Sequence, residues 1–370
     1  MNGWKKRLPA LIICCMLGLL IGCSAQEAEK TPDAVPSAVP AEDVKETGEK
    51  TGRYTPGTYE GTAVGMNGEV RVRVTFDEDA ITEVEIVEHV ETPLISDLAL
   101  SRIPEEIVAF QSLAVDTVTG ATLSSHAVLN AVDGAAEEAG GDPEALRNVA
   151  IPEKEPQPDQ SMEVDVLVVG GGLSGMSTAY ETASAGLETL LVEKLESWGG
   201  SSARSGGAVC YATEEGDPVG YFSAEQYYQW FQNMGHGQIN DDLVRKIAYM
   251  SNDTVQWMRS EIGYDPQYEM TERFVDGTVA RLTNPGSPTE YVTGAGGGMM
   301  KIFYDRISGL ESLTMMNQTQ VVSLTTDAAG AVTGAVAERT DGSTLTIEAK
   351  AVVLATGGWA AGEEYMELWA

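Results

Sequence analysis

Positive charge is scarce in this sequence. Its 370 residues include 23 Lys and Arg against 56 Asp and Glu, which gives a formal net charge of -33 at pH 7. Such an acidic chain repels the phosphate backbone of nucleic acids and the headgroups of anionic lipids. The charge balance therefore disfavours nucleic-acid binding and favours an exposed surface kept in solution by its charge.

Cysteine is also scarce. Three of the four cysteines fall within the first 23 residues, and the fourth is Cys210. The sequence has no C-x-x-C-H haem attachment site and no cysteine cluster with zinc-ligand spacing. We therefore expect no disulfide within the folded part of the chain, and we expect any redox chemistry to depend on organic cofactors.

No hydrophobic run is long enough to span a membrane as a mature helix. The longest, Leu8 to Leu20, follows the basic residues Lys5, Lys6 and Arg7, as in a signal peptide over residues 1–23. The sequence Leu20-Ile21-Gly22-Cys23 resembles the bacterial lipobox. That resemblance implies lipidation of Cys23 and an exported protein anchored to the outer face of the cell membrane. An ordinary secretory signal and an uncleaved anchor are the alternatives.

Two segments have the composition of linkers. Residues 24–53 are rich in Glu, Lys, Pro, Ala and Thr with almost no large apolar side chain, which predicts a disordered tether. Residues 142–161 include Pro152, Pro156 and Pro158 among charged residues. These segments divide the chain into a first domain at 54–141 and a second at 162–370.

The first domain combines strand and helix patterns, so its predicted class is α+β. Apolar residues alternate with polar ones over 70–76, and an apolar pattern resumes over 81–86, which predicts a hairpin with one buried face. One helix is predicted to begin at Pro104, and a second to include the apolar stripe at 127–132.

Between these helices lies the heptad Asp116 to Thr122, Asp-Thr-Val-Thr-Gly-Ala-Thr. It resembles the flavinylation motif D-x-x-[ST]-G-A-[ST] of the FMN-binding domain family. The resemblance implies that Thr122 carries FMN as a covalent phosphoester, attached by a magnesium-dependent flavin transferase. We expect Gly120 and Ala121 to give the transferase clearance, because neither has a bulky side chain. The alternative is that Thr122 only caps the helix after it.

The second domain opens with the pattern of a dinucleotide-binding unit, so its predicted class is α/β and Rossmann-like. A nearly all-apolar strand over 164–169 is of the kind buried on both faces of a parallel sheet. A glycine-rich turn, a helix to about Ala185 and a second strand over 189–192 follow it. This order is the required context of the G-x-G-x-x-G fingerprint.

Each residue of the fingerprint has an expected role. Gly170 allows the tight turn, Gly172 lets backbone amides approach a pyrophosphate, and Gly175 permits close packing of the helix on the strand. Ser174 lies in the same turn, and Glu193 ends the second strand, where it can accept hydrogen bonds from an adenosine ribose. The fingerprint alone leaves FAD and NAD open.

Two later stretches favour FAD by resemblance. The glycine and serine run 199–207, after Glu193-Lys194, and the sequence Ala-Thr-Gly-Gly at 355–358, after an apolar strand over 351–354, resemble the fumarate reductase and succinate dehydrogenase flavoprotein family. The resemblance implies noncovalent FAD. The residues it implies at the flavin are Ser201, Ser202, Gly206, Gly207, Ala355, Thr356 and Gly357.

The segments between these motifs suit the same fold. Residues 223–262 read as helical, and the stretches 321–324, 331–338 and 344–349 read as a meander of strands. The glycine run 293–298 has two readings, a second close approach to flavin or a flexible or packing-driven segment.

As a whole, the chain from Tyr54 onward resembles exported reductases of the fumarate and urocanate type, used in anaerobic respiration. The resemblance implies that a membrane quinol or flavin donor reduces the covalent FMN and that FAD passes hydride to the carbon-carbon double bond of a small unsaturated carboxylate. The family's substrate clamps and proton-donating arginine follow the Ala-Thr-Gly-Gly stretch, whereas this sequence ends at Ala370. We therefore expect a C-terminally truncated chain with an incomplete FAD-binding domain, and we assign no catalytic residue. A lipid-anchored FMN electron carrier and a flavin-dependent dehydrogenase are the alternatives.

Overall fold

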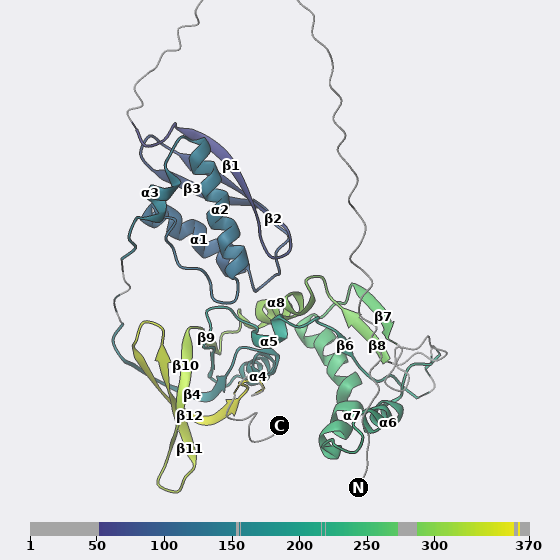
Figure 1. Cartoon of the computed structure of the whole chain (residues 1–370). Helices are drawn as coiled ribbons and strands as arrows, with labels where there is room; N and C mark the ends of the chain where they lie inside the picture. The colour runs from purple at the N-terminus through teal and green to yellow at the C-terminus, as the bar shows by residue number, and fades with distance from the viewer. Residues whose placement is uncertain are drawn as a thin grey trace, which may run out of the picture. The chain divides into compact units, whose positions relative to one another are not determined.

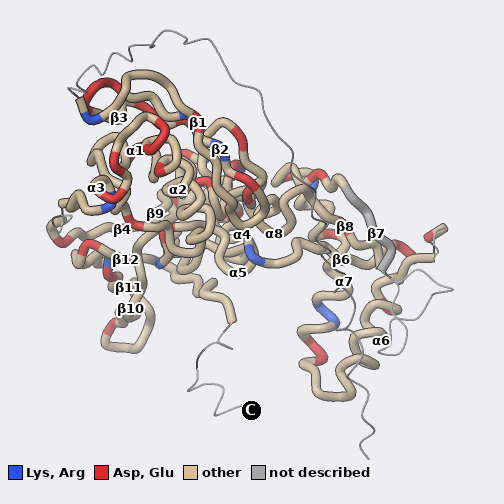
Figure 2. Tube along the Cα trace, turned by 45° about the horizontal axis from the view of Figure 1, so that its top comes forward, with Lys and Arg blue, Asp and Glu red and all other residues tan. Residues whose placement is uncertain are grey.

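The computed structural model describes residues 52–152, 155, 157–215, 217, 218, 220–272, 287–358 and 362. The predicted signal peptide, Cys23 and nearly all of the predicted tether lie outside the described residues. Within the described part, no helix is long and apolar enough to cross a membrane. Acidic residues are spread over both domains with few basic ones between them (Figure 2), and Cys210 is a free thiol.

The first domain contains a three-stranded antiparallel sheet in the order β1-β2-β3 (Figure 1). Its strands are β1 (Gly57–Val64), β2 (Glu69–Phe76) and β3 (Ile81–Glu88). The predicted hairpin is β2 and β3, and the apolar residues of β2 are fully buried, with 0–3% exposure. Sequence patterns did not indicate β1, whose residues alternate less clearly.

Helices α1 (Asp97–Phe110) and α2 (Thr122–Glu138) accompany this sheet. The predicted start of α1 at Pro104 is wrong, because Pro104 lies in the interior of the helix. Proline removes only its own amide bond to residue i-4, and the earlier turn still forms, with the Leu100 amide 2.9 Å from the Ser96 carbonyl.

A third helix, α3 (Pro143–Arg147), falls in the segment predicted as a linker. The side chain of Asp142 caps it by accepting from the Ala145 amide at 3.1 Å. Leu146 is 2% exposed and packs into the core of the first domain. The packed domain therefore extends beyond the predicted boundary at 141.

The second domain is built on a six-stranded sheet in the order β10-β11-β12-β4-β5-β9. The strands β12 (Thr344–Leu354), β4 (Gln160–Val169), β5 (Thr189–Val192) and β9 (Leu313–Met316) are parallel, and α4 (Leu173–Ser184) connects β4 to β5. This is the predicted α/β class. The antiparallel strands β10 (Thr319–Thr326) and β11 (Val332–Arg339) complete the predicted meander.

Residues 344–354 form one continuous strand instead of the two predicted around Lys350. The Lys350 side chain is 75% exposed and lies 2.6 Å from a carboxylate oxygen of Asp165 on β4. The charged residue therefore points out of the sheet and does not interrupt the ladder.

The predicted helical segment 223–262 is also divided. It contains α6 (Ala224–Met234), α7 (Asp241–Trp257) and the π-helix η1 (Met258–Ile262). The break falls at Gly235, which ends α6, and Asn240, whose side chain caps α7 by accepting from the Leu243 amide. Nearby, β6 (Val209–Cys210), β8 (Ser287–Tyr291) and β7 (Tyr268–Glu272) form a small antiparallel sheet.

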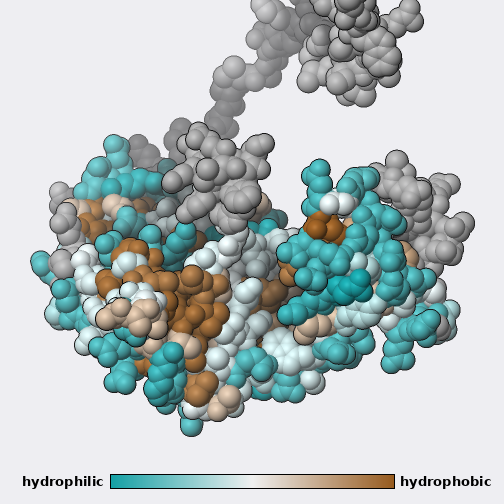
Figure 3. All heavy atoms as spheres, turned by 90° about the horizontal axis from the view of Figure 1, so that it is seen from below, coloured by the Kyte–Doolittle hydropathy of each residue, from teal (hydrophilic) through white to brown (hydrophobic). Residues whose placement is uncertain are grey.

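Two more helices, α5 (Gly200–Ala203) and α8 (Ala295–Ile307), lie on the side of the second domain that faces the first (Figure 1). Leu94, from the loop before α1, belongs to the core cluster that contains Trp198 and Met300. The first domain thus inserts a side chain into the core of the second. On the surface, apolar areas lie open on the face shown in Figure 3. On or beside the six-stranded sheet, the large apolar side chains with substantial exposure are Leu187, Val322, Leu324, Val332 and Leu354.

Candidate functional site

One side of the loop that carries Thr122 packs on the core of the first domain, and the other side is exposed to solvent. Val118 and Ala121 are buried at 0% and 4% exposure. The Ser125 hydroxyl joins them, because it accepts from the Val118 amide at 3.1 Å and donates to the Ala121 carbonyl at 2.8 Å. Thr122 itself is exposed at the first residue of α2. The predicted acceptor hydroxyl is therefore accessible on a rigid support.

The structure does not support two of the expectations about this loop, the capping role of Thr122 and the clearance at Gly120 and Ala121. Ala121 and not Thr122 is the residue that precedes the helix, and no side chain caps α2, so the capping alternative finds no support. Ala121 gives no clearance, because its methyl group faces the core. The space beside Gly120 is occupied as well: its φ is +92°, which favours glycine, and a Cβ there would lie 2.0 Å from Nη2 of Arg204.

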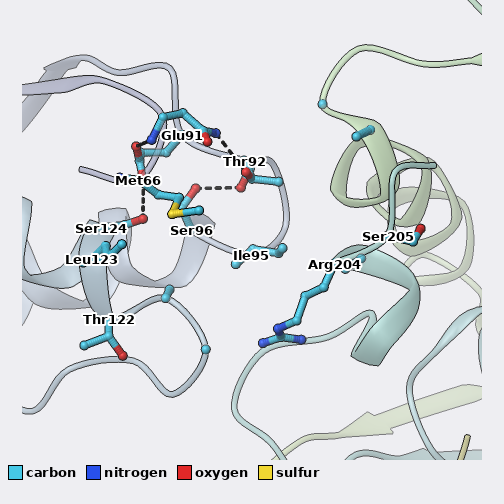
Figure 4. A pocket seen from close by; sticks show the side chains of 16 residues that line it. Met66, Glu91, Thr92, Ile95, Ser96, Thr122, Leu123, Ser124, Arg204 and Ser205 are labelled. Atoms are coloured by element: carbon cyan, nitrogen blue, oxygen red, sulfur yellow. Dashed lines mark hydrogen bonds between the residues drawn. The ribbon is translucent and has the colours of Figure 1, made fainter. Parts of the chain in front are cut away.

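A cavity of about 720 Å³ opens beside Thr122. From the first domain it is lined by the β1–β2 turn, the loop before α1, and the start of α2; from the second it is lined by residues 203–205 and 294–295. Figure 4 shows the side chains that these segments direct toward it. The volume lies within the usual range of cofactor pockets, roughly 300–1,000 Å³. The cavity and an exposed hydroxyl on its wall fit a covalently held FMN.

Glu91, which sequence patterns did not indicate, organises this wall. Its side chain is 4% exposed and accepts hydrogen bonds from the amides of Met66 at 3.1 Å and Asn67 at 2.8 Å, and from the Ser124 hydroxyl. Burial raises the pKa of Glu91, but the bonds from Ser124, Asn67 and Met66 outweigh it, so the net pKa is below the usual glutamate range. One carboxylate thus ties three segments of the cavity together.

The heptad loop is also held against the second domain. The Ser197 hydroxyl donates to the Thr119 carbonyl at 3.4 Å. Arg102 of α1 lies 3.3 Å from the carboxylate of Glu196 and donates to the Asp116 carbonyl at 2.8 Å. The motif's acid, Asp116, therefore contributes its backbone to this contact and leaves its side chain exposed.

The glycine-rich turn after β4 has the geometry that the fingerprint predicts. Gly170 has a φ of +111°, which favours glycine. A Cβ on Gly175 would lie 1.8 Å from the Gly170 carbonyl oxygen, so only glycine allows this packing of α4 on the turn. At Gly172, by contrast, the nearest atoms to a Cβ are 3.8 Å away, the Gly199 carbonyl oxygen and the Ser202 hydroxyl. The space above Gly172 is open.

That open space lies at a helix N-terminus. The first amides of a helix have no intrahelical acceptor, and in α4 these belong to Leu173, Ser174 and Gly175. The Leu173 amide donates to the Ser202 hydroxyl at 3.3 Å. Backbone amides around a cradle without side chains fit a pyrophosphate, so the residues present suit FAD.

Glu193 lies at the end of β5 as predicted, but it is only 6% exposed. Its carboxylate accepts from the amides of Gly171 at 2.8 Å and Leu195 at 2.9 Å. Each oxygen retains a second lone pair, so the carboxylate supports the turn and can still accept from a ribose hydroxyl. Its role toward ribose remains a prediction.

The glycine and serine run reaches both candidate sites. Ser201 and Ser202 lie on α5, while Ser205 accepts at its carbonyl from the Gly296 amide at 3.1 Å. A Cβ on Gly207 would lie 2.4 Å from the carbonyl carbon of Ala295, whereas nothing lies within 4 Å of one on Gly206. Gly207 is therefore a packing residue in this structure, and Gly206 faces open space.

The glycine run 293–298 is explained by packing. A Cβ would lie 2.2 Å from the Ser202 carbonyl oxygen at Gly296, 2.4 Å from the Thr92 methyl group at Gly297, and 1.9 Å from the Thr293 carbonyl oxygen at Gly298. The second predicted reading, packing, holds for these three residues. Gly296 lets α8 approach α5, Gly297 lets it approach the first domain, and Gly298 packs on the loop before α8.

The stretch 355–358 joins the nucleotide turn despite its distance in sequence. The Ala355 amide donates to the Val169 carbonyl at 2.8 Å, and a Cβ on Gly170 would lie 2.4 Å from the Ala355 carbonyl oxygen. Thr356 and Gly357 are exposed, and Gly357 has a φ of +81° with nothing within 4 Å of a Cβ. The structure thus brings Ala355 and Thr356 beside Gly170, and their role at the flavin stays a prediction.

Comparisons with known proteins match both domains. An FAD binding domain family matches residues 165–369, and an FMN-binding domain family matches residues 65–137. The urocanate reductase of Eggerthella lenta is 32% identical over 318 residues, which are 83% of this chain and 50% of that protein. The NADH:acrylate oxidoreductase of Vibrio harveyi is 39% identical over 158 residues, 42% of this chain and 16% of that protein.

Among solved structures, the open conformation of a flavocytochrome c3 fumarate reductase matches with a TM-score of 0.47 and 25% identity, over 57% of this chain and 36% of that chain. The chain spans half the length of the urocanate reductase and a smaller share of the acrylate oxidoreductase. No group of three or more residues that could hold a metal ion occurs among the described residues.

Proposed function

Because the chain belongs to the flavoprotein family defined by this FAD binding domain and carries an FMN-binding domain before it, we propose that it acts in the reduction of a carbon-carbon double bond. The proposed substrate is a small unsaturated carboxylate of the urocanate, acrylate or fumarate class. The names of the similar proteins support this substrate class. The acidic surface gives no support for nucleic acid as a partner.

One observation carries the proposal: a single short segment lines both candidate flavin sites. Gly200 and Ser202 of α5 lie beside the cradle at Gly172, and Arg204 and Ser205 line the cavity at Thr122. Four helical residues advance the chain by about 6 Å. An FMN at Thr122 and an FAD at Gly172 would therefore be close neighbours, as electron transfer between them requires.

Bound flavins supply the redox chemistry, since they accept and release electrons and hydride. The chain's residues hold and separate the two groups. Thr122 offers its hydroxyl oxygen for attachment, Glu91 fixes the wall of its cavity, and the amides of Ser174 and Gly175 would hold the pyrophosphate of FAD. We assign no residue to proton delivery.

The proposal includes a flavin transferase as the partner that attaches FMN. The Thr122 hydroxyl loses its proton and a bond forms between Oγ and the phosphorus of the FMN half of a flavin dinucleotide donor. The pyrophosphate P–O bond of that donor breaks, and the nucleoside monophosphate leaves with the bridging oxygen and takes up the proton. The mass of the chain then rises by that of one FMN less one water. A membrane quinol or flavin donor would supply the electrons.

The same proposal has the protein exported and lipid-anchored through Cys23, in a cell that respires anaerobically. The sequence before and after Cys23 supports it. In an exporting bacterial host, the protein should partition with membranes, and Cys23→Ala should leave an uncleaved precursor. A mature protein whose N-terminus is any residue other than Cys23 would contradict the anchoring.

The experiment for the proposed activity uses the chain produced with a flavin transferase and loaded with FAD. After anaerobic photoreduction, urocanate, acrylate and fumarate are added separately, with the saturated acid of each pair as control. The same assay is run on a form extended through the segments that carry the family's substrate clamps and proton-donating arginine. In that extended form, reoxidation of the flavins by at least one unsaturated acid and by no saturated acid is expected. Flavins of the extended form that stay reduced with all three acids would contradict the proposed substrate class.

A further inference from the structure

Arg204 is a cationic side chain from the second domain that reaches the Thr122 loop of the first. It follows the last residue of α5, and its Nη1 donates to the Gly200 carbonyl at 2.9 Å. Nη2 lies so close to Gly120 that a Cβ there would be 2.0 Å away. Figure 4 shows the guanidinium directed across the cavity toward the loop that bears Thr122.

The charges around the cavity leave this guanidinium without a carboxylate. Glu91 and Arg204 are the two ionisable residues that line it, and Glu91 is engaged with Met66, Asn67 and Ser124. Among the ion pairs of the described residues, none includes Arg204. That is unusual in a chain with more than twice as many acidic as basic residues, and it suits an anionic ligand.

A second feature points to the same place. Thr122 is the first residue of α2, a helix of 17 residues, so any group on its hydroxyl lies beside the free amides of the first turn. Those amides and the helix dipole favour negative charge. Arg204 faces this helix terminus from the other domain.

We propose that Arg204 binds the phosphodiester that flavinylation creates on Thr122, so that the attached FMN joins the two domains through an ion pair. This inference rests on the proposed attachment of FMN to Thr122. A phosphodiester has one negative charge and two non-bridging oxygens, and the planar guanidinium can donate to both. Gly120 is required between them, because any side chain there would displace the guanidinium.

The ion pair would add to contacts that exist without FMN. Those are the 3.4 Å bond between Ser197 and Thr119 and the pair of Arg102 with Glu196. Attachment of FMN would therefore tighten the docking of the heptad loop on residues 197–205. Flavinylation then has a structural effect as well as a redox one.

The test uses hydrogen-deuterium exchange and phosphorus NMR on the full chain, with the mass of the Thr122 peptide measured in every sample. Flavinylated wild type should exchange about tenfold more slowly at residues 116–123 and 197–205 than Thr122→Val, as expected for one hydrogen bond to a charged group. Flavinylated Arg204→Gln should lose that protection, and its phosphodiester resonance should shift. Arg204→Lys should keep part of it, and Lys246→Gln, on the exposed face of α7, should match wild type.

The two proposals fail in different ways. A wild-type Thr122 peptide without FMN would overturn the attachment and this inference together. A flavinylated Arg204→Gln with the resonance and the exchange of flavinylated wild type would overturn the role of Arg204 alone. Arg204→Lys keeps the positive charge on a side chain of similar length. It therefore tests the ion pair even if Arg204→Gln has a folding defect.

Discussion

The two candidate flavin sites hold their groups by opposite means. At Thr122, a single exposed hydroxyl makes the link, and the loop behind it is fixed by Val118, Ala121 and the Ser125 hydroxyl. At Gly172, no side chain makes the link, and the site consists of backbone that approaches closely because Gly170 and Gly175 lack a Cβ. The first site therefore depends on one functional group, and the second depends on the shape of the main chain.

The largest expected effect is the loss of covalent FMN in Thr122→Val. The change removes the side-chain oxygen through which FMN would be attached. Because Thr122 is exposed, the stability of the domain should change by less than about 0.5 kcal/mol. Flavin fluorescence of the denatured protein on a gel measures the link. Thr122→Ser is the matched control and should stay labelled. Full labelling of Thr122→Val would show that the hydroxyl belongs to another residue.

At the second site, Gly175→Ala and Gly172→Ala form a pair that separates folding from binding. The first puts a Cβ 1.8 Å from a backbone oxygen and should destabilise the second domain by about 1–3 kcal/mol or more. The second meets nothing within 3.8 Å and should cost at most about 1 kcal/mol at the start of α4, yet it should weaken FAD binding. Thermal unfolding measures the stability of each variant, and titration with FAD measures its affinity for the cofactor. Equal destabilisation by both changes would contradict the comparison.

Glu193→Ala should weaken FAD binding by about 1.5–3 kcal/mol, the value of a hydrogen bond to a charged group. Covalent FMN should be unaffected, because Glu193 lies in the other site. FAD affinity from equilibrium titration, together with the mass of the Thr122 peptide, checks both statements. Since Glu193 also accepts from the Gly171 and Leu195 amides, Glu193→Gln is the control that keeps one acceptor oxygen. Unchanged FAD affinity in both variants would show that Glu193 does not contribute to FAD binding.

The smallest effect concerns Glu91, and it depends on pH. The pKa of Glu91 is lowered in the folded protein, so its stabilising contribution is present above the pKa of the unfolded chain, about 4.3, and is lost as pH falls through the folded value. Glu91→Gln should therefore be less stable than wild type at pH 7, by about 1–3 kcal/mol. The difference should shrink below pH 4. Denaturant unfolding of the first domain across this range measures it, and a constant difference would contradict the ionised state.

Sequence patterns located the parts of both sites that are local in the chain. The heptad, the glycine turn and Glu193 depend on neighbours within a few residues, so their positions follow from short motifs. The strands β2, β4 and β5 followed equally well from their apolar patterns. Resemblance added Ala355 and Thr356, which the structure places beside Gly170.

The contacts between distant segments could not be predicted in this way. Glu91 bonds to residues 24 and 33 positions away, and Arg204 meets Gly120 across two domains. Neither residue belongs to a periodic pattern. Pro104 and Lys350 misled the local reading, because a helix tolerates one missing amide and a strand tolerates an outward charge.

The central claim is that the two flavins are close neighbours within one chain. It is tested most directly by the rate of electron transfer from photoreduced FMN to FAD, followed by absorbance at several protein concentrations. The account predicts a first-order rate that does not depend on protein concentration and that disappears in Thr122→Val supplied with free FMN. A rate that rises in proportion to protein concentration would show transfer between molecules and contradict the account.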